Sequence, residues 1–146
     1  MLSLDTNILF HALTAGTPQH SSAAAFLESL QNDEAVAICE LVLVELYRLL
    51  RNPALFARPL NASDAAGVMQ QFRRHPRWKI IGFPHDSARL HDQLWELAGE
   101  RGFAYRRVFD VRLALVLRQQ GVTRFATENT KDFAGLGFEK VWNPLR

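Results

Sequence analysis

Two aspartates stand where an apolar segment meets the start of an expected helix. Asp5 ends a short apolar run at the beginning of the chain, and Asp110 precedes a strongly apolar segment, Val111–Gln120. Aspartate is a favoured helix N-cap, so a cap is the simpler explanation for either residue taken alone. The carboxyl end of a strand is also where binding sites form in α/β proteins. Both explanations stay open at this point.

A third acid, Glu45, lies in a segment that is apolar on nearly every side, Leu41–Tyr47. We therefore expect it to be largely buried. A buried, ionised carboxylate is costly unless it is paired or binds a metal ion. An ion pair with Arg48 or Arg51 is the structural alternative.

Asp5, Glu45 and Asp110 together form a candidate oxygen cage for a hard cation. Mg²⁺ and Mn²⁺ prefer carboxylate, carbonyl and water ligands. Spacing along the chain does not by itself show that the three acids converge, because that depends on the fold.

The elements that must position these acids alternate between strand and helix along the whole chain. Short apolar runs predict strands, at 2–5, 35–38, 78–83, 123–127 and 139–142. Helical spacing predicts helices between them, at 6–13, 21–30, 40–52, 61–74, 87–98 and 111–120. This alternation favours an α/β sandwich with a central, mostly parallel sheet of four to five strands. We expect Trp78, Trp95 and Trp142 to fill its core.

Composition places the chain among ordinary globular proteins. Its 146 residues, 48% of them hydrophobic and 22% charged, predict a single domain over 1–146. The net charge of +2 permits nucleic-acid binding without arguing for it. A lone cysteine, Cys39, excludes an internal disulfide and a zinc site of several thiolates. No leader or membrane-length apolar stretch is visible, so we expect a soluble, cytoplasmic protein.

Four short segments resemble the ordered motifs of the PIN-domain nucleases. Three of them contain Asp5, Glu45 and Asp110, and the fourth starts at the end of the strand expected at 123–127. They are Leu4–Leu9, Ile38–Leu46, Asp110–Ala114 and Ala126–Asn129. Each is weak alone, but four in the right order are specific. Asp132-Phe133 and Trp142–Leu145 resemble the tail of that family, and Leu49–Pro53 is most similar to VapC-type toxins of toxin–antitoxin pairs.

The resemblance implies a PIN-like three-layer α/β/α sandwich and assigns roles to particular residues. Asp5 and Asp110 would be the principal metal ligands, with Glu45 completing the acidic pocket. Thr6 and Thr127 would lie at its edge as hydrogen-bonding hydroxyl groups. Asn129 stands where the family often has a fourth aspartate, so one charge is missing there, and Asp132 is the alternative source of it.

The implied activity is hydrolysis of RNA by an endoribonuclease that depends on Mg²⁺ or Mn²⁺, leaving a 5′-phosphate and a 3′-hydroxyl. A metal ion lowers the pKa of water and stabilises the departing oxygen. Three arginines near Asp110 could hold the RNA backbone or pair with the acids, namely Arg106, Arg107 and Arg112.

The family also implies a homodimer and an antitoxin (VapB-like) that occupies the groove. The apolar residues around Leu46, Tyr47, Leu50 and Phe56 could instead form a partner surface. Two other functions remain open: a non-catalytic RNA-binding or scaffold module, and a metal-dependent phosphatase or DNA nuclease.

Overall fold

The expected alternation of strands and helices is present in the computed structural model, which describes residues 1–146 without a gap. The strands are short: β1 (Leu2–Leu4), β2 (Val36–Cys39), β3 (Lys79–Ile81), β4 (Arg124–Ala126) and β5 (Lys140–Trp142). The helices are α1 (Thr6–Leu13), α2 (His20–Leu30), α3 (Glu40–Leu50), α4 (Ala62–Arg73), α5 (Ser87–Ala98), α6 (Arg107–Gln119) and α7 (Thr130–Phe133).

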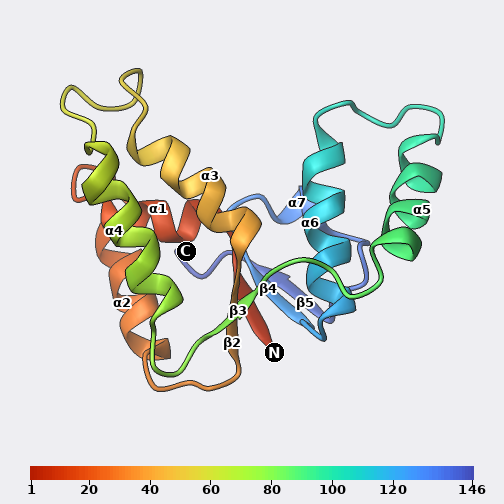
Figure 1. Ribbon diagram of the computed structural model, residues 1–146, viewed down its shortest axis with the longest axis horizontal. Helices are drawn as coiled ribbons and strands as arrows, with labels where there is room; N and C mark the ends of the chain where they lie inside the picture. Colours follow the sequence, from red (N-terminus) through yellow and green to blue (C-terminus); the bar gives the residue numbers. More distant parts are fainter.

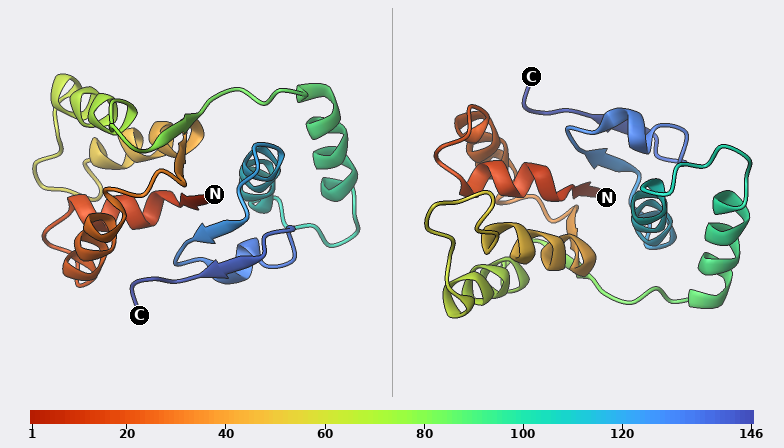
Figure 2. Two further views of the ribbon diagram at one scale, coloured as in Figure 1. Left: turned by 90° about the horizontal axis from the view of Figure 1, so that it is seen from below. Right: turned by 90° about the horizontal axis from the view of Figure 1, so that it is seen from above.

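All five strands pair in parallel in the order β3-β2-β1-β4-β5. The chain therefore moves from β1 towards one edge through β2 and β3, and then crosses to the other edge through β4 and β5. Figures 1 and 2 show α1–α4 gathered on one side of the sheet and α5 and α6 on the other. The α/β/α sandwich expected from the sequence is confirmed, with five strands.

The direction of winding reverses between β1 and β4. In such sheets a crevice opens outside the carboxyl ends of the strands at this switch point. Leu4, the last residue of β1, lies opposite Ala126, the last residue of β4. The next residues in each segment, Asp5 and Thr127, therefore emerge side by side at the crevice.

The sheet is buried because its strands are apolar on both faces, as parallel strands covered by two helical layers must be. Leu4, Ile38 and Phe125 are completely inaccessible to solvent. They belong to one continuous hydrophobic core with the inner faces of α3 and α6. A rigid core directly beneath the crevice fixes the backbone from which the acids project.

Three expectations about elements were wrong. Helix α6 begins at Arg107, so Asp110 lies inside its first turn and does not precede it. The short helix α7 was not expected, because four residues carry no detectable periodicity. Trp95 is 61% exposed, whereas Trp78 is buried and Trp142 packs against the core. None of the helices is both long and apolar enough to cross a membrane.

Candidate active site

Asp5 is the most buried acid of the candidate site, with an exposure of 7%. It caps α1, since its Oδ1 accepts a hydrogen bond of 2.8 Å from the backbone N–H of Thr6. Its Oδ2 accepts a short bond of 2.6 Å from the hydroxyl of Thr127 and a longer one, 3.3 Å, from Asn7 Nδ2. Asp5 is therefore the N-cap of α1, but the cap uses only one of its two carboxylate oxygens.

Thr127 ties β4 to the first turn of α1. Its side chain is completely buried, and its Oγ1 donates to Asp5 while accepting from the backbone N–H of Asn129 at 2.9 Å. A hydroxyl has one proton to donate and two lone pairs. Because that single proton goes to Asp5, Thr127 orients the carboxylate and is too buried to contact a substrate directly.

Glu45 is exposed, contrary to the expectation from its apolar surroundings. Helix α3 buries one stripe, which includes Val42, Leu43 and Leu46, and turns Val44 and Glu45 to the open side. Glu45 forms no ion pair with an arginine, so the structural alternative for this residue is not observed. Its Oε2 instead accepts a hydrogen bond of 3.0 Å from Thr6 Oγ1.

Asp110 is half-buried in the first turn of α6 and is not the helix cap. Its carboxylate has neither a salt-bridge partner nor a side-chain hydrogen bond. Burial raises its pKa, the charges of Asp132 and Glu45 raise it further, and Arg107 lowers it. Because Asp110 neither caps the helix nor pairs with a basic side chain, no stabilising role in the fold accounts for an acid at this position.

The acids repel one another electrostatically. Burial raises the pKa of Asp5 to about 6, against the hydrogen bonds from Thr127 and Thr6 that lower it. Glu45 and Asp110 both raise it further, and Glu45 also raises the pKa of Asp110. Asp5, Glu45 and Asp110 therefore lie close enough for their charges to influence one another. A nearby cation would reverse this repulsion.

The donor set fits a hard cation that keeps part of its water shell. No group of three or more His, Cys, Asp or Glu side chains is arranged to hold an ion by itself. Mg²⁺ does not require such a cage, because it is usually bound by one or two carboxylates together with water and substrate phosphates. Asp5 and Asp110 supply carboxylate oxygens of this kind, and the carboxylate of Glu45, hydrogen-bonded to Thr6, borders the same site.

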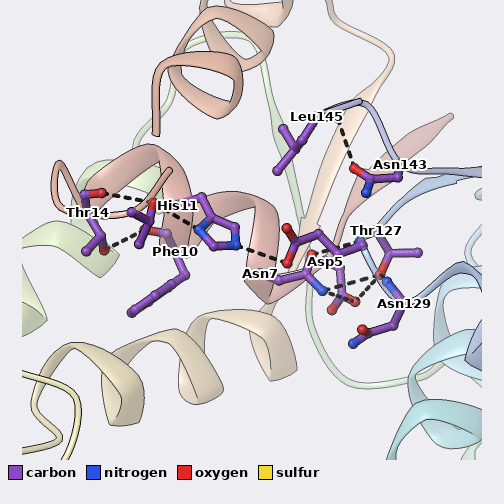
Figure 3. Close-up of polar contacts among 11 residues, drawn as sticks. Asp5, Asn7, Phe10, His11, Thr14, Thr127, Asn129, Asn143 and Leu145 are labelled. Carbon is purple, nitrogen blue, oxygen red and sulfur yellow. Dashed lines mark hydrogen bonds and ion pairs between the residues drawn. The ribbon is translucent and has the colours of Figure 1, made fainter. Parts of the chain in front are cut away.

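Asn129 and Asp132 lie on the side of the site formed by α7. Asn129 is exposed and precedes the helix, and Figure 3 shows its amide beside Asp5 and Thr127. Asp132 is also exposed, and it affects the pKa of Asp110 more strongly than Glu45 does. Both residues therefore border the acidic site, Asn129 towards Asp5 and Asp132 towards Asp110.

A cleft of about 1390 Å³ opens between α3 and α6 and includes Glu45 and Asp110 among its lining residues. Four arginines also line it, two from each wall, namely Arg48, Arg51, Arg106 and Arg112. Two apolar side chains stand exposed in it, Val44 at 68% and Phe109 at 75%. An acidic floor with basic and apolar walls suits a polyanion that carries flat, apolar groups.

Of the three arginines selected from the sequence, Arg106 and Arg112 line this cleft and Arg107 does not. Arg107 lies over the ring of Phe103, although its charge still reaches Asp110. The Nε of Arg112 is buried without a hydrogen-bond partner. A buried, unpaired guanidinium nitrogen is costly, so Arg112 is the arginine best suited to receive an anion.

Sequence reasoning missed the cleft residues on α3. Arg48 and Arg51 were considered only as partners for Glu45. The helical spacing of Leu41, Val44, Arg48 and Asn52 could have identified a shared face. Of the residues expected at a partner surface, Leu46 and Leu50 are buried, whereas Tyr47 lines the cleft and Phe56 is partly exposed.

Comparison with known proteins places these features in a family. Residues 2–139 match the model of the PIN domain. The chain is 48% identical over 145 residues to "Ribonuclease VapC24" of Mycobacterium tuberculosis, covering 99% of this chain and 97% of the relative.

Two solved structures share the fold at low sequence identity. The toxin VapC20 of M. tuberculosis, described as cleaving the sarcin–ricin loop, superposes with a TM-score of 0.68 at 20% identity, covering 94% of this chain and 96% of VapC20. VapBC2 of Rickettsia felis, solved with a DNA fragment from its promoter, gives 0.67 at 20% identity and 97% coverage of both chains.

Proposed function

This chain belongs to the PIN domain family, and we propose that it is a metal-dependent endoribonuclease, the toxin of a VapC-type toxin–antitoxin pair. The observation that carries the proposal is the unneutralised acidic cluster at the switch point of the sheet. Burial raises the pKa of both Asp5 and Asp110, the charge of Asp110 raises that of Asp5 further, and neither carboxylate forms a salt bridge. Such an arrangement suits the binding of a divalent cation.

Asp5 and Asp110 would hold Mg²⁺ or Mn²⁺, and Glu45 would bind through water at its edge. The bound ion would supply Lewis acidity and charge neutralisation at the phosphodiester. The surrounding residues have supporting tasks. Thr127 fixes the rotamer of Asp5, and Thr6 links Glu45 to the same turn of α1.

The reaction is hydrolysis of an RNA phosphodiester bond. The oxygen of a water molecule forms a bond to phosphorus, and the bond from phosphorus to the 3′-oxygen breaks. The products are a 5′-phosphate and a 3′-hydroxyl, and the water proton ends on the departing oxygen.

The cleft between α3 and α6 is the proposed RNA path. The four arginines that line it, Arg48, Arg51, Arg106 and Arg112, are placed to contact phosphates on either side of the acids. The exposed ring of Phe109 directly precedes Asp110, and aromatic rings of this kind stack with unpaired bases. Single-stranded RNA is therefore the preferred substrate class.

The same cleft would accept a segment of the antitoxin, as the toxin–antitoxin relationship implies. An apolar segment would cover Val44 and Phe109, and acidic or backbone carbonyl groups would pair with the arginines. Occupation of the cleft would block RNA directly. We also propose that the protein is a homodimer, which sedimentation of the purified chain would test.

The deciding experiment incubates the purified protein with single-stranded RNA, the same sequence as DNA, and a small phosphate monoester. We expect cleavage of RNA alone, with Mg²⁺ or Mn²⁺ and not with excess EDTA. Asp110→Asn should abolish it, while Asp92→Asn, a matched change at an exposed position on α5, should not. Cleavage of DNA or of the monoester at the RNA rate, or undiminished cleavage by Asp110→Asn, would overturn the proposal.

A further inference from the structure

A contact between a histidine and a glutamate joins α1 to the segment after β4, six residues along the chain from Asp5. His11 Nε2 lies 3.0 Å from Oε2 of Glu128. The two side chains are 13% and 26% exposed, so water screens this pair less than it screens the pairs on the surface. Figure 3 shows the ring of His11 in line with Asn7, Asp5 and Thr127.

Glu128 is also held through its backbone. Its N–H donates a hydrogen bond of 3.2 Å to Oδ1 of Asn7. The Nδ2 of the same amide reaches Oδ2 of Asp5 at 3.3 Å and Oγ1 of Thr127 at 3.4 Å. Asn7 and His11 are four residues apart and thus share one face of α1. That face holds Glu128 at two points, by its backbone and by its carboxylate.

The imidazole that holds the carboxylate is itself fixed. His11 Nδ1 lies 3.0 Å from Oγ1 of Thr17, so both ring nitrogens have partners. The carbonyl of His11 accepts a hydrogen bond of 2.9 Å from His20 Nδ1. A ring with both nitrogens engaged loses little further entropy when it pairs with Glu128, which makes it an effective anchor.

The anchored segment carries one side of the candidate site. Thr127 orients Asp5, and Asn129 follows Glu128 directly and precedes α7, which carries Asp132. The backbone N–H of Asn129 donates back to Thr127 Oγ1 at 2.9 Å. Any movement of Glu128 therefore moves the residues on both sides of it relative to Asp5.

We propose that His11 and Glu128 are a positioning pair, which fixes residues 127–129 against α1 and thereby holds Thr127 and Asn129 at the acidic site. The proposal assigns neither residue to the chemistry itself. Its activity readout rests on the proposed ribonuclease function, but its structural readout does not. The alternative is an ion pair that adds stability only, as the exposed pair of Arg77 and Glu34 at 2.8 Å would.

The test uses the full chain and the variants His11→Ala, Glu128→Ala, their double mutant and Glu128→Gln, with Glu34→Ala as the matched control. Cleavage of single-stranded RNA gives kcat and KM, titration calorimetry gives Mn²⁺ affinity, and NMR gives the exchange rate of the Asn129 amide. We expect each alanine variant to lower kcat by about 10-fold with little change in KM. Mn²⁺ affinity should fall and the Asn129 amide should exchange faster.

Two comparisons separate positioning from other effects. The double mutant should be no worse than the poorer single variant, because either change releases the same segment. Glu128→Gln keeps a hydrogen-bond acceptor for His11 but removes the charge, so it should restore most of the activity lost in Glu128→Ala. If Glu128→Gln is as poor as Glu128→Ala, the charge matters and positioning is wrong.

Other outcomes are equally clear. A lower melting temperature with unchanged kcat and unchanged exchange of the Asn129 amide would make the pair purely structural and overturn the proposal. An equal loss of kcat in the control variant Glu34→Ala would also overturn the proposal. If the wild type cleaves no RNA, the proposed function fails, and the exchange of the Asn129 amide alone then supports or overturns the positioning pair.

Discussion

The hydroxyl of Thr127 donates a 2.6 Å hydrogen bond to Oδ2 of Asp5, joining residues that are 122 positions apart in the chain. This contact exists because β1 and β4 are parallel neighbours whose last residues are in register. It connects the carboxylate that caps α1 to the segment that precedes α7. The predictions below depend on this geometry and on the charges around it.

Replacing Thr127 by valine should misorient Asp5 without opening a cavity. Valine has nearly the same shape but cannot donate, so Oδ2 of Asp5 would lose its shortest hydrogen bond. We expect kcat to fall by about 10-fold to 100-fold and stability to fall by about 1–3 kcal/mol. RNA cleavage assays and urea unfolding measure the two effects. Thr127→Ser should restore both, and a serine variant as poor as valine would contradict this role of the hydroxyl.

Asp5→Asn should stabilise the metal-free protein above pH 6 and not below pH 4. The pKa of Asp5 is raised by burial to about 6 from 3.8, so the folded state holds a proton that the unfolded state has lost. Stability therefore falls as pH rises from about 4 to 6, and the penalty remains above pH 6. About two pKa units correspond to about 3 kcal/mol at most.

Urea unfolding in EDTA from pH 4 to pH 8 measures this difference between wild type and Asp5→Asn. Asparagine can still cap the helix, but its amide replaces the oxygen that accepts from Thr127, so the change of the stability difference with pH, and not its absolute size, isolates the charge. The account would be contradicted if the wild type gained stability relative to the variant as pH rises through this window. Excess Mn²⁺ should stabilise the wild type alone, so that at pH 7.5 the wild type becomes more stable than Asp5→Asn.

Asn129→Asp should strengthen metal binding, and Asp132→Asn should weaken it. The first change adds a carboxylate beside Asp5, and the second removes a charge that raises the pKa of Asp110. Calorimetric titration with Mn²⁺ should give several-fold changes in opposite directions. No change in either variant would place the α7 side of the cluster outside the metal site.

Arg51→Ala should weaken RNA binding and reduce its salt dependence. Arg51 lines the cleft, and each phosphate contact on a single strand contributes about 0.7 to the slope of log K against log salt. Fluorescence anisotropy in EDTA, which prevents cleavage, measures this slope. Arg124→Ala is the matched control, because Arg124 is exposed at the amino end of β4, away from the crevice. Equal losses in both variants would argue for nonspecific charge effects.

The fold was largely predictable because its signals are local. Apolar runs bounded by turn residues predicted all five strands, and strand-end positions selected Asp5. Asp110 was also selected because it was expected at the start of a helix. That reason was partly wrong, because α6 begins at Arg107 and Asp110 is not its cap. That correction strengthens its candidacy, because the structural task expected of it does not exist.

Exposure on α3 was not predictable from composition. Apolar residues occupy most of that helix, so composition alone does not distinguish the buried Leu46 from the exposed Val44 and Glu45. Only the placement of α6 across the crevice leaves one face of α3 open. The pair of His11 and Glu128 was likewise hidden, because 117 residues separate its members and neither lies in a recognisable pattern.

The central claim is that Asp5 and Asp110 form one divalent-cation site. Titration calorimetry of the purified chain with Mn²⁺ at pH 7.5 tests it most directly, comparing the wild type with Asp110→Asn. We predict binding to the wild type and a loss of affinity of about 100-fold or more in the variant, beyond the range typical of residues behind the ligands. Equal affinity in both proteins, or no binding to either, would contradict it.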